Sequence, residues 1–219
     1  MNRVRVGVID SGVHATHPHV NGVAGGVAID GDGRESNDYV DRIGHGTAVT
    51  AVIREKAPQA DVFAVKVFDR RLTTNIDTLV RAIEWCARNE MQLVNLSLGT
   101  QNMEHAAKLQ AAVDQAAAAG AFVISALEDD GVRWLPGALR GVIPVVLDWT
   151  VERDLYRTEQ LADGRTVMHA SGFPRPAPGV PPERNLKGIS FAVANVTGLI
   201  AREMFSGHHF DGPLAGTSS

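Results

Sequence analysis

VRVGVIDSG, residues 4–12, is the stretch that most clearly indicates the fold. Val4–Ile9 is a short run rich in β-branched side chains, which predicts a strand, and Asp10-Ser11-Gly12 predicts the turn that ends it. Strand and helix patterns alternate along the rest of the chain, which predicts an α/β fold with a doubly wound, mostly parallel sheet and helices on both faces. The further predicted strands are residues 61–68, 92–98, 121–126 and 142–147, and the predicted helices are residues 47–55, 76–89 and 104–119.

The length and composition are those of a globular domain. The chain has 219 residues, of which 44% are hydrophobic and 21% charged, and its formal net charge is −4. We expect one domain over residues 1–206, with a Pro-rich loop at residues 173–182 and a disordered tail at residues 207–219. The lack of a basic excess argues against nucleic acid as a partner, and no apolar run is long enough to span a membrane.

Cysteine content and the beginning of the sequence bear on the compartment. Cys86 is the only cysteine, so no intramolecular disulfide can form. The first residues enter a β-type pattern directly, without the charged and apolar segments of a secretory leader. These features predict a cytoplasmic protein, and they do not indicate an oligomeric state.

Three polar residues lie where catalytic groups of an α/β fold are found. Asp10 ends the first predicted strand, His45 lies between two glycines at the start of a predicted helix, and Ser190 precedes apolar residues at helical spacing. Ser190 alone has two interpretations, either an N-cap of that helix or a nucleophile at its positive end. With the other two it completes a set in which a carboxylate orients an imidazole and the imidazole takes the serine proton.

The sequence around these residues resembles that of the subtilisin-like serine peptidases. VGVIDSGVHATHPHV (6–20) is similar to the first motif of that family, and GHGTAVTAVI (44–53) is similar to the second. GISFAVANVTG (188–198) matches the spacing of the nucleophile motif, with Ile189 in place of the usual Thr and Ala194-Asn195 in place of the usual Pro-His. The resemblance implies that Asp10, His45 and Ser190 form a catalytic triad that requires no cofactor.

The resemblance extends between the motifs and covers roughly residues 4–205, clearly to about residue 148. The intervening stretches that carry it are APQADVFAVKVFD (57–69), AIEWCARNEMQLVNLSLGT (82–100) and AAVDQAAAAGAFVISA (111–126). They are similar to the family's successive strands and helices, including its substrate-binding strand.

The sequence departs from the family where the resemblance implies an oxyanion hole. The family has Gly-Asn-Glu-Gly or a similar run there, and its Asn donates to the tetrahedral oxyanion. The corresponding stretch is VISALEDDG (123–131), in which Asp129 takes the place of that Asn. An ionised carboxylate only accepts hydrogen bonds, so Asp129 could donate only when protonated. Otherwise a backbone N–H would have to stabilise the oxyanion.

The resemblance also suggests where a peptide would bind. Ser97-Leu98-Gly99 corresponds to the strand edge along which substrate residues pair. Ala126-Leu127-Glu128 corresponds to one wall of the pocket for the side chain before the scissile bond, with Asp130 near its mouth. The acidic side chains there favour Arg or Lys in the substrate. Trp134 opposes this preference, because its ring could fill the pocket floor and leave room only for a small side chain. A third interpretation is that the acidic side chains are surface charges with no role in specificity.

Two clusters of potential metal ligands are interpreted as structural. Asp30, Asp32 and Glu35 lack the spacing of an EF-hand loop, so a solvated loop is the better explanation. His14 and His19 flank His17, whose His-Pro pair resembles one in the family at the same place. We therefore expect no metal site.

The sequence thus predicts a compact cytoplasmic endopeptidase that cleaves peptide bonds through an acyl-enzyme on Ser190. Its substrate would be a peptide or protein, such as one specific precursor peptide. Two alternatives stay open. One is a binding or scaffold protein on the same fold, catalytically weak or inactive because of Asp129, and the other is an esterase or acyl transferase that uses the same triad.

Overall fold

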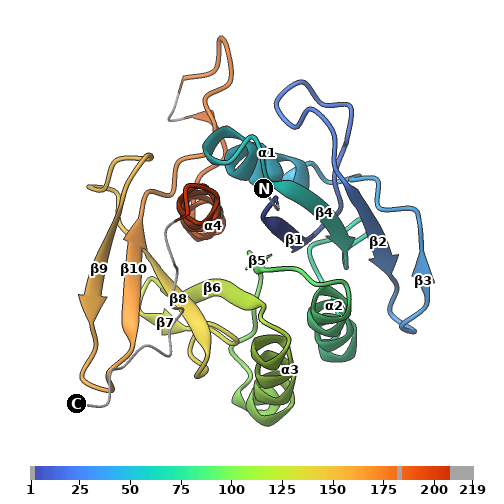
Figure 1. Cartoon of the computed structure of the whole chain (residues 1–219), viewed down its shortest axis with the longest axis vertical. Helices are drawn as coiled ribbons and strands as arrows, with labels where there is room; N and C mark the ends of the chain where they lie inside the picture. Colours follow the sequence, from blue (N-terminus) through green and yellow to red (C-terminus); the bar gives the residue numbers. More distant parts are fainter. Residues whose placement is uncertain (1–2, 182–183, 208–219) are drawn as a thin grey trace.

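The chain forms an α/β fold around one large sheet (Figure 1), in a computed structural model that describes residues 3–181 and 184–207. The strands are β1 (Arg5–Asp10), β2 (Gly25–Ile29), β3 (Glu35–Ser36), β4 (Asp61–Lys66), β5 (Leu93–Leu96), β6 (Phe122–Asp129), β7 (Val132–Arg133), β8 (Val142–Leu147), β9 (Tyr156–Gln160) and β10 (Thr166–Ala170). The helices are α1 (His45–Lys56), α2 (Ile76–Arg88), α3 (Ala106–Ala118) and α4 (Ile189–Phe205), with a short 3₁₀ helix, η1 (Met103–His105).

The sheet is mostly parallel. Its described strands follow the order β3-β2-β4-β1-β5-β6-β8-β10-β9, and β7 pairs with β6 outside this path. Every neighbouring pair from β2 to β10 is parallel, whereas β3, β7 and β9 are antiparallel to their partners. Strand β1 lies inside the sheet although it comes first in the chain, which is the crossover expected of a doubly wound fold. The predicted fold class is confirmed.

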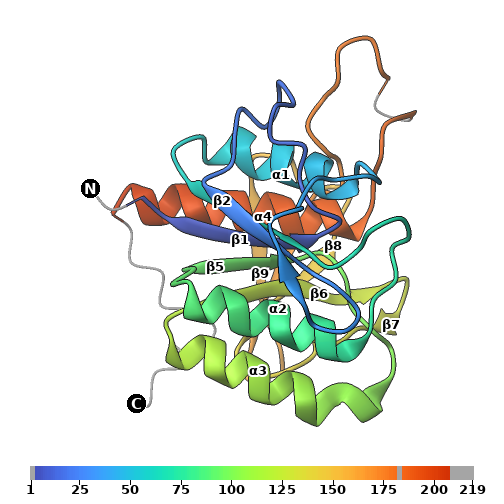
Figure 2. The same cartoon turned by 90° about the vertical axis from the view of Figure 1, so that its right-hand side faces the viewer.

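Helices cover both faces of the sheet (Figure 2). Helices α1 and α4 lie on one face, and α2 and α3 lie on the other. The alternation of side chains along β1 sends Val8 into the first layer, where it joins the core beneath α1 and α4, and Ile9 into the second. Both residues are fully buried, which explains why β1 is a nearly continuous apolar run instead of an alternating one.

Helix α4 is apolar around most of its circumference because it is enclosed. Residues Phe191–Ala201 are all buried between α1 and strands β5, β6, β8 and β10. A Cβ on Gly198 would lie 2.7 Å from the Cβ of Lys56, so α1 and α4 approach closely at this glycine. Their tight packing fixes the position of the first turn of α4 relative to α1.

Some sequence predictions need correction at their ends. The strand predicted at residues 92–98 ends at Leu96, and the one predicted at residues 121–126 continues to Asp129. The helix predicted at residues 104–119 begins as the 3₁₀ helix η1. Five strands were not predicted, namely β2, β3, β7, β9 and β10. The pattern of β2 is weak because it opens with two glycines, and that of β9 is weak because it has four exposed polar residues.

The remaining predictions on the chain ends and loops have different outcomes. Residues 173–181 form a loop without regular structure, as predicted, and it projects beyond α1 and α4 (Figure 1). Of the predicted tail, residues 208–219 lie outside the described residues. Within residues 3–181 and 184–207, no helix has the length and apolar character needed to cross a membrane.

Candidate active site

Two elements bring Asp10 and His45 together. Asp10 is the last residue of β1, and His45 is the first residue of α1. The Nδ1 atom of His45 lies 2.8 Å from Oδ1 and 2.9 Å from Oδ2 of Asp10. Because an ionised carboxylate only accepts hydrogen bonds, Nδ1 carries the proton in this pair, and Nε2 of the neutral ring is left as an acceptor.

Close backbone packing holds this pair in place. The N–H of Ser11 donates to Oδ1 of Asp10 at 2.7 Å, and the N–H of Gly46 donates to the hydroxyl of Ser11 at 2.9 Å. A Cβ on residue 46 would lie 2.2 Å from the carbonyl oxygen of Gly12, which real structures do not tolerate. Glycine at position 46 therefore lets the first turn of α1 contact the end of β1.

The environment of His45 favours its protonated form. Burial alone would lower the pKa of the imidazole, but the hydrogen bond and charge of Asp10, with a smaller effect of Asp41, raise it above its ordinary value. A general base must be neutral to accept a proton. Activity that depends on His45 is therefore lost as the pH falls through this raised pKa.

Asp41 organises the beginning of α1, and sequence reasoning missed it. Its Oδ1 accepts hydrogen bonds from the Ser11 hydroxyl and from the N–H groups of Ile43 and Gly44, at 2.8 to 2.9 Å. Its Oδ2 accepts from the N–H and the hydroxyl of Thr47, at 2.9 and 2.6 Å. Burial opposes ionisation of Asp41, but these hydrogen bonds outweigh it and lower the pKa of the carboxyl. An Asp shortly before a predicted helix was the signal that could have found it.

Ser190 is not an N-cap. Helix α4 begins at Ile189, after Gly188 with a φ of 141°, so Ser190 lies within the first turn. Its hydroxyl donates to the backbone carbonyl of Ser97 at 3.2 Å. Within the described part of the chain, no hydrogen bond joins Ser190 to His45. The hydrogen bond between a nucleophile and its general base is often long or poorly aligned before a substrate binds. Its absence here is therefore compatible with catalysis.

Ser190 and His45 are nevertheless neighbours through Phe191. The rings of His45 and Phe191, the residue after Ser190, have centroids 6.0 Å apart. The first turns of α1 and α4 therefore meet beside the end of β1. The positive end of the α4 dipole makes this a favourable place for developing negative charge.

A buried polar network joins α4 to the segment that follows β5. The Asn95 amide donates to the Ser97 hydroxyl at 2.7 Å, and the Thr197 hydroxyl donates to the Asn95 side-chain oxygen at 3.0 Å. Asn95 and Thr197 are fully buried, so these bonds are expensive to break. The network holds Ser97 next to the first turn of α4.

Leu98 and Gly99 continue from this point along the predicted substrate edge. Thr100, the next residue, forms a bridge with Leu135, with N–H to carbonyl distances of 2.9 and 3.0 Å. A Cβ on Gly99 would lie 2.4 Å from the Leu135 carbonyl oxygen. The segment after β5 is therefore partly paired already with a neighbouring segment of the same chain.

The residues predicted for the pocket and the oxyanion position lie in the hairpin of β6 and β7. Ala126-Leu127-Glu128 and Asp129 end β6, and Asp130, with a φ of 50°, forms the turn. Burial, and then the charge of Asp130, raise the pKa of Asp129. Trp134 follows β7 and its Cε3 lies 3.5 Å from where a Cβ of Gly99 would stand. Its indole nitrogen is buried without a hydrogen-bond partner within the described chain.

The candidate metal ligands have local partners. Oδ1 of Asp30 accepts the N–H groups of Asp32 and Arg34, and the ring of His17 packs edge-on to that of His19 with centroids 5.3 Å apart. Among residues 3–181 and 184–207, no group of three or more His, Cys, Asp or Glu is arranged to hold a metal ion.

Comparison with known proteins identifies the family of the chain. The model of the subtilase family matches residues 2–143, which include Asp10, His45 and Asp129 but end before Ser190. This match covers more than half of the 219 residues. The chain belongs to the subtilase family.

Individual relatives match over the same part of the chain. Subtilisin E of Bacillus subtilis is 34% identical over 139 residues, which are 59% of this chain and 35% of that protein. The thermostable alkaline protease of Halalkalibacterium halodurans is 33% identical over 155 residues, 66% of this chain and 41% of that protein. The subtilisin of Bacillus pumilus is 34% identical over 139 residues, 59% of this chain and 49% of that protein. The matched region thus spans between about a third and a half of these curated relatives.

Asp41→Ala should lower the free energy of unfolding at pH 7 by about 2 kcal/mol, because it removes the acceptor for the first turn of α1. The pKa of Asp41 is lowered by folding, so its contribution is present above the unfolded value of about 3.9 and is lost as the pH falls through the folded value. Urea denaturation at pH 7 and at acid pH measures both effects. Asp38→Ala, which removes an exposed ion pair with Arg42, is the matched control. Equal losses in the two variants would contradict the role given to Asp41.

Proposed function

We propose that the protein is a serine endopeptidase in which Ser190 attacks the peptide carbonyl. As the bond from Oγ to carbon forms, Nε2 of His45 takes the hydroxyl proton, and it then gives that proton to the leaving amine when the C–N bond breaks. Water hydrolyses the resulting ester by the same route in reverse. Asp10 keeps the proton on Nδ1 and stabilises the imidazolium. No cofactor takes part in these steps.

The observation that carries this proposal is the pair of short contacts between His45 and the buried carboxylate of Asp10, 2.8 and 2.9 Å long. It is supported by Ser190 in the first turn of α4, next to Phe191, and by membership of the subtilase family. A structural role for Asp10 and His45 alone would not require an Nε2 that, among the described residues, has no hydrogen-bond partner and can act as a general base.

We propose a peptide or protein as the substrate. Its residues on the acyl side of the scissile bond would pair with Ser97-Leu98-Gly99. Among the described residues, the carbonyl of Ser97 accepts a hydrogen bond from the Ser190 hydroxyl, at 3.2 Å, and an extended peptide could take that place. A specific precursor peptide in the cytoplasm is our proposal for its setting. Three relatives carry protease or subtilisin in their names, which agrees with a peptide substrate.

A fluorophosphonate probe should label the wild-type protein but not Ser190→Ala, because the probe reacts with an activated serine hydroxyl. Ser206→Ala, a matched change at the other end of α4, should be labelled like the wild type. Mass spectrometry of the labelled protein locates the modified residue. Labelling that persists in Ser190→Ala would rule out Ser190 as the nucleophile, and no labelling at any pH would favour a binding or scaffold protein.

The esterase alternative needs a separate comparison. A peptide and a small ester tested side by side on the wild type would distinguish the two activities, since an esterase gains nothing from pairing along the segment after β5. Hydrolysis of the ester with no cleavage of peptides would exclude the endopeptidase.

Asp129→Asn should raise kcat/KM at pH 8 by about tenfold or more, within the range that one oxyanion donor supplies. Asp129 has a raised pKa, so it regains a donor as the pH falls and the advantage of Asn shrinks. As the pH falls, His45 becomes protonated and can no longer act as a base. The activity of the wild type is therefore expected to have a narrow pH profile on the acid side. Asp114→Asn, an exposed change on α3, is the control. If kcat/KM of Asp129→Asn at pH 8 is equal to or below that of the wild type, Asp129 is not the oxyanion residue.

Glu128 and Asp130 should direct cleavage toward Arg or Lys before the scissile bond, because a carboxylate on the pocket wall attracts a basic side chain. A positional-scanning peptide library measures this preference. The contact of Trp134 with Gly99 is the feature that opposes it. If Ala or Gly dominates at that position, the acidic pocket is contradicted and a pocket closed by Trp134 becomes the better explanation.

A further inference from the structure

A cavity of about 350 Å³ lies where three segments of the chain meet, and it has no part in the catalysis proposed above. The segments are the loop after β1, the first half of α1 with the residues before it, and the loop before α4. Its volume is within the range of pockets that bind small ligands. We call it the histidine pocket, and the polar residues of its lining that matter below are His14, His17, His19, Asp41, Arg175 and Asn185.

Arg175 supplies the permanent positive charge of the histidine pocket. Its Nη1 donates to the backbone carbonyl of His19 at 2.9 Å, and its own carbonyl accepts from the side-chain amide of Asn185 at 3.3 Å. Within residues 3–181 and 184–207 Arg175 has no ion pair with Asp or Glu, in contrast to Arg153, which pairs with Glu55. A guanidinium carries five N–H donors, so most of the hydrogen-bonding capacity of Arg175 is unused by these residues.

The imidazoles add a further donor. Nδ1 of His17 accepts the backbone N–H of His19 at 3.2 Å, so the proton of the neutral His17 ring lies on Nε2, which has no hydrogen-bond partner among the described residues. Burial lowers the pKa of His19, and the charges of Arg175 and His17 lower it further against a smaller opposing effect of Glu55. The ring of His19 therefore lies in surroundings of net positive charge.

Asp41 is the carboxylate that lines the histidine pocket, and its charge is already compensated. It accepts five hydrogen bonds at the beginning of α1, where the positive end of the helix dipole also favours it. The donors are the hydroxyls of Ser11 and Thr47 and the N–H groups of Ile43, Gly44 and Thr47. The surplus of donors on the other walls is therefore available to an anion from outside.

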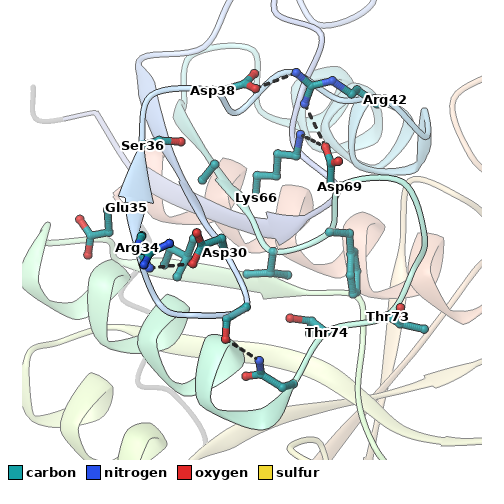
Figure 3. Close-up of a pocket in the computed structure, with 16 residues that line it drawn as sticks. Asp30, Arg34, Glu35, Ser36, Asp38, Arg42, Lys66, Asp69, Thr73 and Thr74 are labelled. Carbon is teal, nitrogen blue, oxygen red and sulfur yellow. Dashed lines mark hydrogen bonds and ion pairs between the residues drawn. The ribbon is translucent and has the colours of Figure 1, made fainter.

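A larger cavity, of about 860 Å³, provides a contrast (Figure 3). It lies between the β2–β3 hairpin and the end of β4, and its cations are paired. Lys66 donates to Asp69 at 3.1 Å, and Arg42 lies between Asp38 and Asp69, at 2.7 and 3.1 Å (Figure 3). An anion would have to break these pairs, so it is disfavoured there. In the described part of the histidine pocket, Arg175 has no such pair to break.

The loop that carries Arg175 is already joined to α4. The N–H of Gly188, which precedes α4, donates to the carbonyl of Gly172 at 2.9 Å, and the buried amide of Asn195 donates to the carbonyl of Phe173 at 3.1 Å. The bond from Arg175 to the carbonyl of His19 joins the same loop to the loop after β1. A ligand held by both loops would strengthen this second attachment and restrain the approach to Ser190.

We propose that the histidine pocket is a regulatory site for a small polyanion with carboxylate or phosphate groups, which contacts Arg175 and His17 at the same time. The ligand ties the loop before α4 to the loop after β1, and so holds the segments that lead to Ser190 and from Asp10. Binding itself is independent of the proposed endopeptidase function, whereas the effect on the reactivity of Ser190 rests on it.

Isothermal titration calorimetry of the full chain with acetate, succinate and tricarballylate compares one, two and three carboxylates at constant ionic strength. Affinity should rise at least tenfold from acetate to tricarballylate, because each added carboxylate can make a charge-assisted hydrogen bond. Inorganic phosphate in the same series shows which anionic group the pocket prefers. Binding of neither tricarballylate nor phosphate overturns the proposal, and so does tighter binding of an acidic peptide, which would indicate a polypeptide partner.

Two pairs of variants locate the binding. Arg175→Gln should weaken binding of tricarballylate at least tenfold, whereas Arg184→Gln, an exposed change outside the lining, should not. Ala177→Trp fills the pocket without changing a charge and should abolish binding, whereas Val180→Trp, exposed and outside the lining, should leave it unchanged. The second pair decides the matter if Arg175→Gln does not fold. Equal losses within either pair overturn the proposal.

Stability and exchange test the restraint on the loop. Tricarballylate at ten times its Kd should raise the Tm of the wild type by about 4 °C, whereas sodium chloride of equal ionic strength should not. Hydrogen exchange should slow in residues 173–181. A shift that sodium chloride reproduces, or protection confined to other parts of the chain, overturns the proposal.

The regulatory effect has its own measurement. Bound tricarballylate should raise the rate of fluorophosphonate labelling of Ser190 about fivefold, at the lower end of allosteric coupling, in the wild type and in Arg184→Gln but not in Arg175→Gln. If the protein is not a peptidase, labelling is absent while binding measured by calorimetry persists, so the two failures are distinguishable. Binding that leaves the labelling rate of a reactive Ser190 unchanged overturns the regulatory role.

Discussion

The contact between the end of β1 and the first turn of α1 is the constraint on which the candidate site depends. Gly46 leaves no room for a side chain between the two elements, and Ser11 joins them through hydrogen bonds to Gly46 and Asp41. With the two backbones this close, Nδ1 of His45 is held against the carboxylate of Asp10, which is buried. Helix α4 is then fixed by its own enclosure, so its first turn adds Ser190 to a site that is otherwise complete.

The parts of the fold that were predictable are those whose sequence pattern reflects burial. Residues 4–9 were predictable as a strand because β1 is covered on both faces, so its side chains are apolar almost without interruption. Strand β9 carries exposed polar residues and is stabilised by pairing with β10 at the edge of the sheet, which leaves no periodic signal. Strand ends were also uncertain, because β6 continues to Asp129 only through its pairing with β7 and β8.

The candidate site divides in the same way. Asp10, His45 and Ser190 could be nominated because each lies in a recognisable local motif. The groups that hold them could not, since Ser11 and Asp41 are 30 positions apart and Asn95 and Thr197 are 102 apart. The alternative of Ser190 as a cap failed for a local reason, namely that Gly188 is the N-cap and the helix begins at Ile189, two residues earlier than a cap at Ser190 requires.

The edge of the sheet constrains the pair of Asp10 and His45 less directly than the junction of β1 and α1 does. Strand β4 separates the β2–β3 hairpin from β1, whereas the junction leaves no room for a Cβ at position 46. Substitutions at the exposed positions of β3 are therefore expected to leave the contact between Asp10 and His45 in place. Engineering of this fold should begin at the hairpin and keep glycine at position 46.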